Sequence, residues 1–356
     1  MVTILIGDCI EQMKTLPDES VQCCVTSPPY WGLRRYLADD DPNKKHEIGL
    51  EPTPEAYVVK IVEVFREVRR VLRKDGTVFL NLGDCYAGSG RGYISKETNG
   101  IKPKDLVGIP WMVAFALRSD GWYLRSAIIW HKPNPMPESV TDRCTKAHEY
   151  IFLLTKSAKY YFDNIAIMEP AAYDGHKDAR FKGSKKIDDR ANAINTIAPA
   201  RNKRDVWTIN SQPFSGAHFA TFPPSLVRPC ILAGTSERGC CPDCGSPWER
   251  IVEQKHMVIK RSKRLHSLGQ TRSSGTMLSP AESKTTGWRS TCTCNAGEPI
   301  SCTVLDPFGG SGTVGEVAEV HGRNSILIEL NPVYIKMAKK RTAQQGLFCS
   351  ARGVEG

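Results

Sequence analysis

The sequence predicts an α/β fold in which helices cover both faces of a doubly wound, mostly parallel β-sheet. Three observations support this prediction. Short apolar segments alternate with longer segments in which apolar residues recur every three or four positions. A Gly-rich turn separates one expected strand from the helix after it. With 356 residues, the chain is long enough for one large domain with insertions.

The first half of the chain contains most of the expected elements. Val58, Ile61 and Phe65 share a helical period, and Asp75-Gly76 is expected to turn the chain into the next strand. The expected strands are Val2–Ile6, Val21–Thr26, Thr77–Leu82, Leu124–Trp130 and Tyr150–Thr155. The expected helices are Cys9–Leu16, Glu55–Arg73 and Trp111–Ser119.

The second half returns to this pattern after two basic, polar segments, residues 166–206 and 235–303. Between them, residues 218–231 regain a compact helical pattern after two prolines. The last α/β unit is expected to contain a strand at Thr303–Leu305, a helix at Val314–His321, a strand at Ser325–Glu329 and a helix at Val333–Lys340.

The excess positive charge lies in two segments. Of the net charge of +10, residues 171–206 carry +4 and residues 246–290 carry +6. This concentration is typical of a polyanion-binding surface, although two solvated loops explain it equally well. The sequence contains no apolar run as long as a membrane-spanning helix, and its start does not resemble a signal peptide. We therefore expect a cytoplasmic protein that does not contact a membrane.

A Gly-rich segment, Asp306-Pro-Phe-Gly-Gly-Ser-Gly-Thr313, lies between an expected strand and helix. Its glycines allow the backbone to approach a ligand closely, and the helix N-terminus offers unpaired N–H groups. Glu329 ends the next strand, where a carboxylate suits the hydroxyls of a ribose. A simple tight turn uses the same residue types as this Gly-rich segment. The segment and Glu329 together, however, predict a nucleoside-binding site. The sequence pattern lacks the spacing of a dinucleotide fingerprint and the lysine of a phosphate-binding loop.

A second segment, Thr26-Ser-Pro-Pro-Tyr30, directly follows an expected strand. The two prolines stiffen the turn and leave carbonyl groups without a neighbouring amide to satisfy them. Ser27 adds a hydroxyl acceptor, and Tyr30 adds a flat aromatic face. These groups suit a planar base with an amino group. Taken alone, a Pro-rich loop packed by an aromatic ring is the simpler interpretation.

The pairing of these two segments resembles the amino-methyltransferases of DNA, and the resemblance covers nearly the whole chain. The Pro-Pro-Tyr segment precedes the Gly-rich segment, which is the order of the circularly permuted β group. The resemblance implies a Rossmann-like fold that uses S-adenosylmethionine (SAM). With the cysteine pattern below, it divides the chain into a catalytic half (1–165), a target-recognition region (166–206), a cofactor-pocket segment (207–234), a zinc-binding insertion (235–302) and a SAM-binding half (303–345).

The resemblance also implies the site residues. The residues that hold the target base are Ser27, Pro28, Pro29 and Tyr30. Those expected to bind SAM are Asp8, Cys9, Phe222, Pro223, Asp306, Pro307, Phe308, Gly309, Gly310, Ser311, Gly312, Thr313, Glu329 and Asn331. Among them, Glu329 is expected to bind the ribose and Asp8 the adenine.

Serine at position 27, in place of aspartate or asparagine, resembles the cytosine-N4 branch more than the adenine-N6 branch. We therefore expect methyl transfer from SAM to the N4 amino group of cytosine in double-stranded DNA. Ser27 and the Pro28 carbonyl can accept the two amino protons and free the nitrogen lone pair for direct attack. The base must leave the duplex to reach them, and Tyr30 can stack on it.

Other functions stay open at this point. The same fold could methylate adenine N6, RNA or protein, or the chain could be a DNA-binding protein that lacks catalysis. The sequence also leaves open whether a restriction endonuclease or a second copy of the chain is a partner.

Five of the 13 cysteines lie in one region, and without a secretory signal a disulfide framework is not expected. Cys241-Pro-Asp-Cys244 and Cys292-Thr-Cys294 form two close pairs that can supply four thiolates to a structural zinc ion. Cys240 could replace Cys241, and unrelated buried or free cysteines are the alternative. The basic run Lys260–Arg264 between the pairs could touch DNA phosphates.

Overall fold

The computed structural model describes residues 1–88, 100–170, 200–212, 222–255, 282–295 and 297–351. The chain forms two compact units. The first consists of Met1–Asp163, Arg204–Glu249 and Ser290–Gly356, and the second of Asn164–Lys203 and Arg250–Arg289. In the described part of the chain, none of the helices has both the length and the apolar character needed to cross a membrane.

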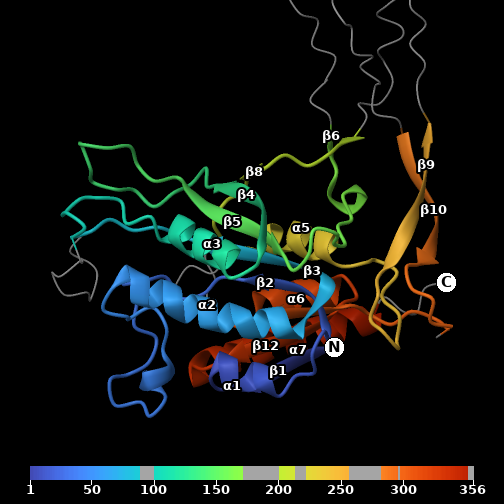
Figure 1. Ribbon diagram of the computed structural model, residues 1–356, viewed down its shortest axis with the longest axis horizontal. Helices are drawn as coiled ribbons and strands as arrows, with labels where there is room; N and C mark the ends of the chain where they lie inside the picture. Colours follow the sequence, from blue (N-terminus) through green and yellow to red (C-terminus); the bar gives the residue numbers. More distant parts are fainter. Residues whose placement is uncertain (89–99, 171–199, 213–221, 256–281, 296, 352–356) are drawn as a thin grey trace, which may run out of the picture. The chain divides into compact units, whose positions relative to one another are not determined.

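The first unit contains an eight-stranded sheet with the order β1-β12-β11-β2-β3-β5-β4-β8 (Figure 1). Its strands are β1 (Val2–Ile6), β2 (Val21–Thr26), β3 (Leu72–Leu82), β4 (Tyr123–His131), β5 (His148–Thr155), β8 (Val206–Thr208), β11 (Thr303–Asp306) and β12 (Asn324–Glu329). β5 is antiparallel to both of its neighbours, and the other pairs are parallel. The predicted doubly wound, mostly parallel sheet is confirmed.

Strands from the two ends of the chain are interleaved in this sheet. β11 and β12, the last strands in sequence, lie between β1 and β2, the first two. The register pairs Ile6 with Glu329 and Cys24 with Leu305. The carboxyl ends of these four strands therefore lie at one edge, as the permuted order of the two halves requires.

Helices cover both faces of the sheet, as can be followed in Figure 1. The helices are α1 (Cys9–Lys14), α2 (Pro54–Val71), α3 (Ile109–Ser119), α5 (Pro224–Gly234), α6 (Thr313–Val320) and α7 (Pro332–Ala351). Buried residues of α1, α2 and α3 share one core cluster with Cys24 and Leu80. Gly234 of α5 packs against Cys23, because a Cβ at Gly234 would lie 2.5 Å from Cys23 Sγ. Cys23 and Cys24 are successive residues of β2, so their side chains point to opposite faces of the sheet. The group α1–α3 therefore covers one face, and α5 lies on the other.

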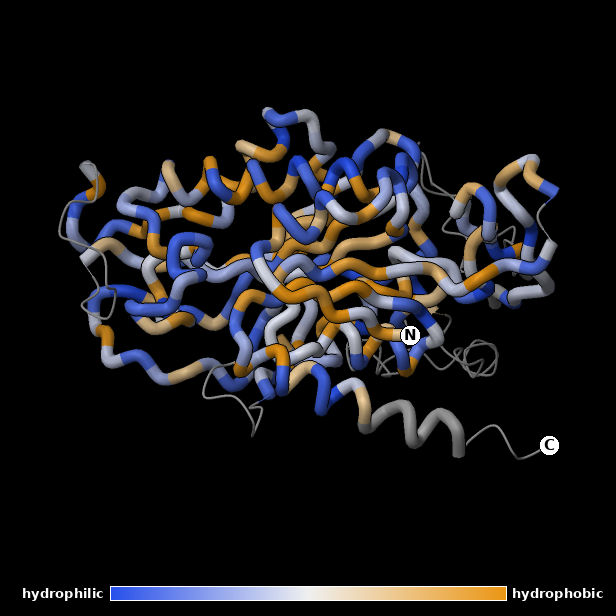
Figure 2. The backbone as a smooth tube through the Cα atoms, turned by 90° about the horizontal axis from the view of Figure 1, so that it is seen from below, coloured by the Kyte–Doolittle hydropathy of each residue, from blue (hydrophilic) through white to orange (hydrophobic). Residues whose placement is uncertain are grey.

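The strongest local signals explain why these elements form. All six residues of β2 are buried, as expected for a strand covered on both faces, and Figure 2 shows apolar residues concentrated along the central strands. α2 begins at the N-cap Thr53, whose hydroxyl accepts a hydrogen bond from Ala56 N at 3.2 Å. Pro54 follows at the first helical position, where its missing N–H does not matter.

The predicted turn at Asp75-Gly76 is wrong, because these residues lie inside β3. Val21 pairs with Leu72 and Cys23 pairs with Thr77, so the residues between Leu72 and Thr77 form an irregular bulge. A Cβ at Gly76 would lie 2.6 Å from Leu72 Cγ, and this bulge therefore needs glycine. α7 also continues past the predicted end at residue 340 to Ala351.

The second unit is built from short strand pairs. β6 (Glu169–Pro170) pairs with β7 (Ala200–Arg201), and β9 (Trp248–Lys255), which starts in the first unit, pairs with β10 (Glu282–Ser290). Most of the basic residues predicted to contact DNA, including the run at 260–264, lie outside the described residues. The boundaries predicted for the target-recognition region and the zinc-binding insertion stay predictions.

Candidate active site

A cavity of about 280 Å³ opens at the edge of the sheet where its parallel strands end. Fifteen of the predicted site residues line it: Asp8, Cys9, Ser27, Pro28, Pro29, Tyr30, Phe222, Pro307, Phe308, Gly309, Gly310, Ser311, Thr313, Glu329 and Asn331. Pro223, Asp306 and Gly312 are predicted as well but do not line it. Segments distant in sequence meet here because the parallel strands end at one edge.

Asp306 joins the two predicted segments beneath the cavity. Its Oδ1 accepts hydrogen bonds from Thr26 Oγ1 at 2.7 Å and from Phe308 N at 3.1 Å. The side chain is 1% exposed, and this burial raises its pKa to about 7. Asp306 therefore fixes the ends of β2 and β11 relative to each other instead of facing the cavity.

Gly312 also has a packing role. It is the N-cap of α6, with φ at 85°, and a Cβ there would lie 2.9 Å from Ala338 Cα of α7. Pro223 is the buried N-cap of α5. Each of these residues stands next to one that does line the cavity: Phe222 precedes Pro223, and Thr313 follows Gly312.

Two carboxylates define the part of the cavity at β1 and β12. Glu329 accepts hydrogen bonds from Gly310 N and Asn331 N, both at 2.7 Å, and burial raises its pKa. Asp8 is the N-cap of α1, accepts from Glu11 N at 3.0 Å, and has His46 Nδ1 at 3.6 Å. Glu329 ends β12 and Asp8 comes just after the neighbouring strand β1, so the two carboxylates lie at adjacent strand ends.

A polar network surrounds Tyr30 in the other part of the cavity. Tyr30 Oη donates a hydrogen bond to Glu149 Oε2 at 2.7 Å, and Ser27 Oγ donates to Tyr30 Oη at 3.3 Å. Asn81 Nδ2 donates to the same Glu149 oxygen at 3.2 Å, and Lys132 forms an ion pair with Glu149. Burial and the neighbouring Glu149 raise the pKa of Tyr30, so its hydroxyl stays protonated.

The two prolines of this segment present different carbonyl groups. The Pro29 carbonyl accepts a hydrogen bond from Tyr57 Oη at 2.9 Å, which ties the loop to α2. Among the described residues, no hydrogen bond reaches the Pro28 carbonyl. The Ser27 hydroxyl and the Pro28 carbonyl can therefore both accept protons from a ligand in the cavity.

Sequence reasoning missed several lining residues. Asn81 lies near the end of β3, and Lys132 directly follows β4. Glu149 lies near the start of β5, whose antiparallel direction brings it to the same edge. Polar residues at strand ends were the available signal, but the antiparallel direction of β5 was needed to use it. Tyr36 and Tyr334, with ring centroids 6.2 Å apart, also line the cavity and carry no periodic signal.

The four cysteines predicted as metal ligands lie together in the first unit. The sulfurs of Cys241, Cys244, Cys292 and Cys294 all lie within 4.8 Å of one another. A tetrahedral zinc with Zn–S bonds of about 2.3 Å needs sulfurs roughly 3.8 Å apart, so the group fits this donor set. Cys240 is separate from the cluster, because its backbone pairs with Ile300.

Comparison with known proteins shows the family to which the chain belongs. The fold is that of the Rossmann-like methyltransferases: the solved PvuII DNA methyltransferase (cytosine-N4-specific) matches with a TM-score of 0.55 and 16% identity, over 96% of this chain and 86% of that one. A family model described as DNA methylase matches residues 21–245 and 295–340.

Two sequence relatives match over nearly their full lengths. The Type II methyltransferase M.Cfr9I of Citrobacter freundii is 38% identical, over 95% of this chain and 87% of the relative. The Type II methyltransferase M.SmaI of Serratia marcescens is 37% identical, over 95% and 89%. The chain belongs to the N6/N4 DNA methylase family, and it is a SAM-dependent DNA methyltransferase.

Proposed function

We propose that this enzyme transfers a methyl group from SAM to the exocyclic N4 of cytosine in duplex DNA. The observation that carries the proposal is that Ser27-Pro-Pro-Tyr30 and the turn at Gly310 line one cavity. Serine at position 27 favours cytosine over adenine. The printed specificity of the PvuII structure, cytosine N4, supports the same choice.

The amino group of cytosine is a weak nucleophile because its lone pair is conjugated with the ring. When bound, SAM supplies an electrophilic methyl group on a sulfonium. Ser27 Oγ and the Pro28 carbonyl accept the two amino protons and hold the nitrogen in a pyramidal geometry, which frees the lone pair. The new N–C bond forms as the C–S bond breaks, so the chain needs no covalent nucleophile. The buried strand cysteines Cys23 and Cys24 take no part, since burial raises the pKa of both thiols.

The methylated nitrogen then loses one proton. Ser27 Oγ donates to Tyr30 Oη, and Tyr30 Oη donates to Glu149 Oε2. This chain of hydrogen bonds offers the proton a route from Ser27 to the Glu149 carboxylate. Lys132 forms an ion pair with the same carboxylate and so holds it beside the Tyr30 hydroxyl.

Duplex DNA must release the base before it can enter the cavity. Flipping a base out costs a few kcal/mol. Phosphate contacts from the basic segments at 171–206 and 246–290 would offset this cost.

Methyl-labelled SAM, duplex DNA and the purified chain test the proposal. After digestion to nucleosides, we expect label in N4-methylcytosine. Ser27→Ala should bind the same DNA but lose activity about 10²- to 10³-fold, whereas the exposed Ser139→Ala should behave like the wild type. Label in N6-methyladenine would establish the runner-up reaction, and absence of label would favour a DNA-binding protein without catalysis.

We also propose that Cys241, Cys244, Cys292 and Cys294 hold a structural zinc ion. Four thiolates close the tetrahedral coordination sphere and leave no position for a substrate. The mutual approach of the four sulfurs supports this assignment. Zinc is therefore expected to stabilise the fold and to take no part in methyl transfer.

A further inference from the structure

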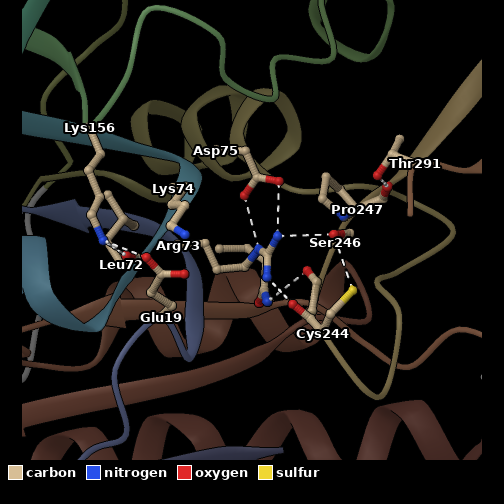
Figure 3. A network of polar contacts seen from close by, with 12 residues as sticks. Glu19, Leu72, Arg73, Lys74, Asp75, Lys156, Cys244, Ser246, Pro247 and Thr291 are labelled. Atoms are coloured by element: carbon tan, nitrogen blue, oxygen red, sulfur yellow. Dashed lines mark hydrogen bonds and ion pairs between the residues drawn. The ribbon is translucent and has the colours of Figure 1, made fainter. Parts of the chain in front are cut away.

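The turn between Cys244 and Ser246 is hydrogen-bonded to Arg73, a residue of the bulge in β3. Figure 3 shows the Arg73 side chain reaching this turn. The guanidinium donates to the Cys244 carbonyl and, at 3.1 Å, to Ser246 Oγ. It also forms a two-pronged ion pair with Asp75, with Nε to Oδ1 at 2.9 Å and Nη2 to Oδ2 at 3.1 Å. All three nitrogens are engaged, and the side chain is only 11% exposed.

Gln22 of β2 makes a second link to the same turn. Its Nε2 donates to the Gly245 carbonyl at 3.3 Å, and its Oε1 accepts from Thr303 N of β11 at 2.7 Å. Gly245 has φ at 70°, and a Cβ there would lie 3.1 Å from both Arg73 Nη1 and Gln22 Nε2. A side chain at position 245 would therefore crowd both contacts, and glycine adopts this left-handed backbone conformation without strain.

The second cysteine pair is joined to the same turn from the other direction. Thr291, next to Cys292, donates from its Oγ1 to the Pro247 carbonyl at 2.7 Å. Within the first pair, Gly245 N donates to the Cys241 carbonyl at 2.8 Å. An ion bound by both pairs would thus fix the carbonyl groups of residues 244 and 245 that Arg73 and Gln22 contact.

The links reach strands that carry the active site at their other ends. Gln22 lies near the start of β2, and Ser27 directly follows its end. Arg73 lies near the start of β3, and Asn81 lies near its end. The match to the DNA methylase family leaves out residues 246–294, which include Cys292 and Cys294. The sulfur cluster therefore joins a segment outside the family match to the sheet that the family shares.

We propose that the metal site is an anchor of the catalytic sheet: zinc on the four cysteines orders the 244–246 turn, which holds β2 and β3 through Gln22 and Arg73. This inference rests on the proposed zinc ion. Binding free energies couple reciprocally. The free energy by which zinc strengthens the Arg73 contacts must therefore equal the free energy by which those contacts strengthen zinc binding. A zinc ion that only ordered its own loop would show no such coupling.

The test compares Arg73→Met with Arg66→Met. Arg66 also pairs with an aspartate, Asp120, but from α2 and without contact to the cysteine turn. We expect Arg73→Met to weaken zinc binding roughly 10-fold in competition with a chromophoric chelator. Chelation should also lower its melting temperature less than it lowers that of the wild type. Arg66→Met should match the wild type in both measurements.

Hydrogen exchange provides the second readout. In the wild type, chelation of zinc should increase hydrogen exchange of the β2 and β3 amides. The milder variant Arg73→Lys should bind zinc with an affinity between those of the wild type and Arg73→Met. If Arg73→Met and Arg73→Lys bind zinc like the wild type and chelation leaves β2 protection unchanged, the anchor is refuted while the zinc site stands. A wild-type chain without zinc would instead refute the zinc assignment itself, and the anchor with it.

Discussion

The active-site cavity and the cysteine cluster are assembled in different ways. The cavity depends on contacts such as that between Thr26 and Asp306, which are 280 positions apart in sequence. The cluster consists of two short pairs, each with its ligands within three positions. The cavity therefore exists only when the parallel sheet is complete, whereas each cysteine pair is local in sequence and a metal ion would bridge the two pairs. Cavity variants should change binding and catalysis, and cluster variants should change stability.

The largest expected effect tests the cluster side of this comparison. Cys292→Ser should abolish zinc binding and lower the melting temperature by roughly 5–10 °C, because a tightly bound metal adds about 3–4 kcal/mol to stability. SAM affinity of the folded protein should stay unchanged. Cys144→Ser is the matched control, since Cys144 is an exposed cysteine outside the cluster. Equal melting temperatures for the two variants would contradict a structural metal.

Glu329→Gln tests the cavity side. Glutamine places an N–H₂ group against Gly310 N or Asn331 N, where the carboxylate now accepts two hydrogen bonds. We expect SAM affinity to fall about 10- to 100-fold by calorimetric titration, with zinc content unchanged. Glu55→Gln, an exposed residue in the first turn of α2, should bind SAM normally. Unchanged affinity in Glu329→Gln would remove Glu329 from the site.

The pH dependence of stability tests the contact between the two motifs. Burial raises the pKa of Asp306 to about 7, so between roughly pH 4 and 7 the folded chain keeps a proton that the unfolded chain has lost. Stability should therefore fall as pH rises through this window. Asp306→Asn retains the Oδ1 acceptor and removes the titration.

Asp306→Asn should therefore be more stable than the wild type at pH 8, and the difference should shrink as the pH falls and vanish near pH 4. Denaturant unfolding at several pH values measures it. The exposed Asp40→Asn should follow the wild-type profile. A constant offset at all pH values would show that Asp306 acts only through packing.

The smallest expected effect tests whether methyl transfer depends on the position of the Tyr30 ring. A Cβ at Gly83 would lie 2.5 Å from Tyr30 Cε2, so Gly83→Ala must displace the ring and its contact with Glu149. We expect methyl transfer to fall about tenfold, the cost of roughly 1.4 kcal/mol, with little change in SAM affinity. Gly287→Ala is the control, because its nearest neighbour lies at 3.7 Å. Equal activity in both variants would show that the position of Tyr30 is unimportant.

Sequence alone predicted most elements of the fold and the two segments that line the cavity. Continuous apolar runs such as β2 and the helical period of α2 are local signals, and local burial produces them. The Pro-Pro-Tyr and Gly-rich segments were recognisable because their chemistry needs particular residues at fixed spacing. Of the two neighbouring cysteines, Cys241 lies with the other three sulfurs of the predicted metal site, and the metal itself stays a prediction.

Only the tertiary structure decided how these segments combine. It placed Glu149, near the start of antiparallel β5, beside Tyr30. Where a turn was expected at Asp75-Gly76, the structure has a bulge in β3, and Arg73 in this bulge contacts the Cys244 carbonyl. It also showed that Asp306 is buried between two strands. The physical reason is the same in each case: strand direction, register and burial are properties of the assembled sheet, and residue spacing along the chain does not contain them.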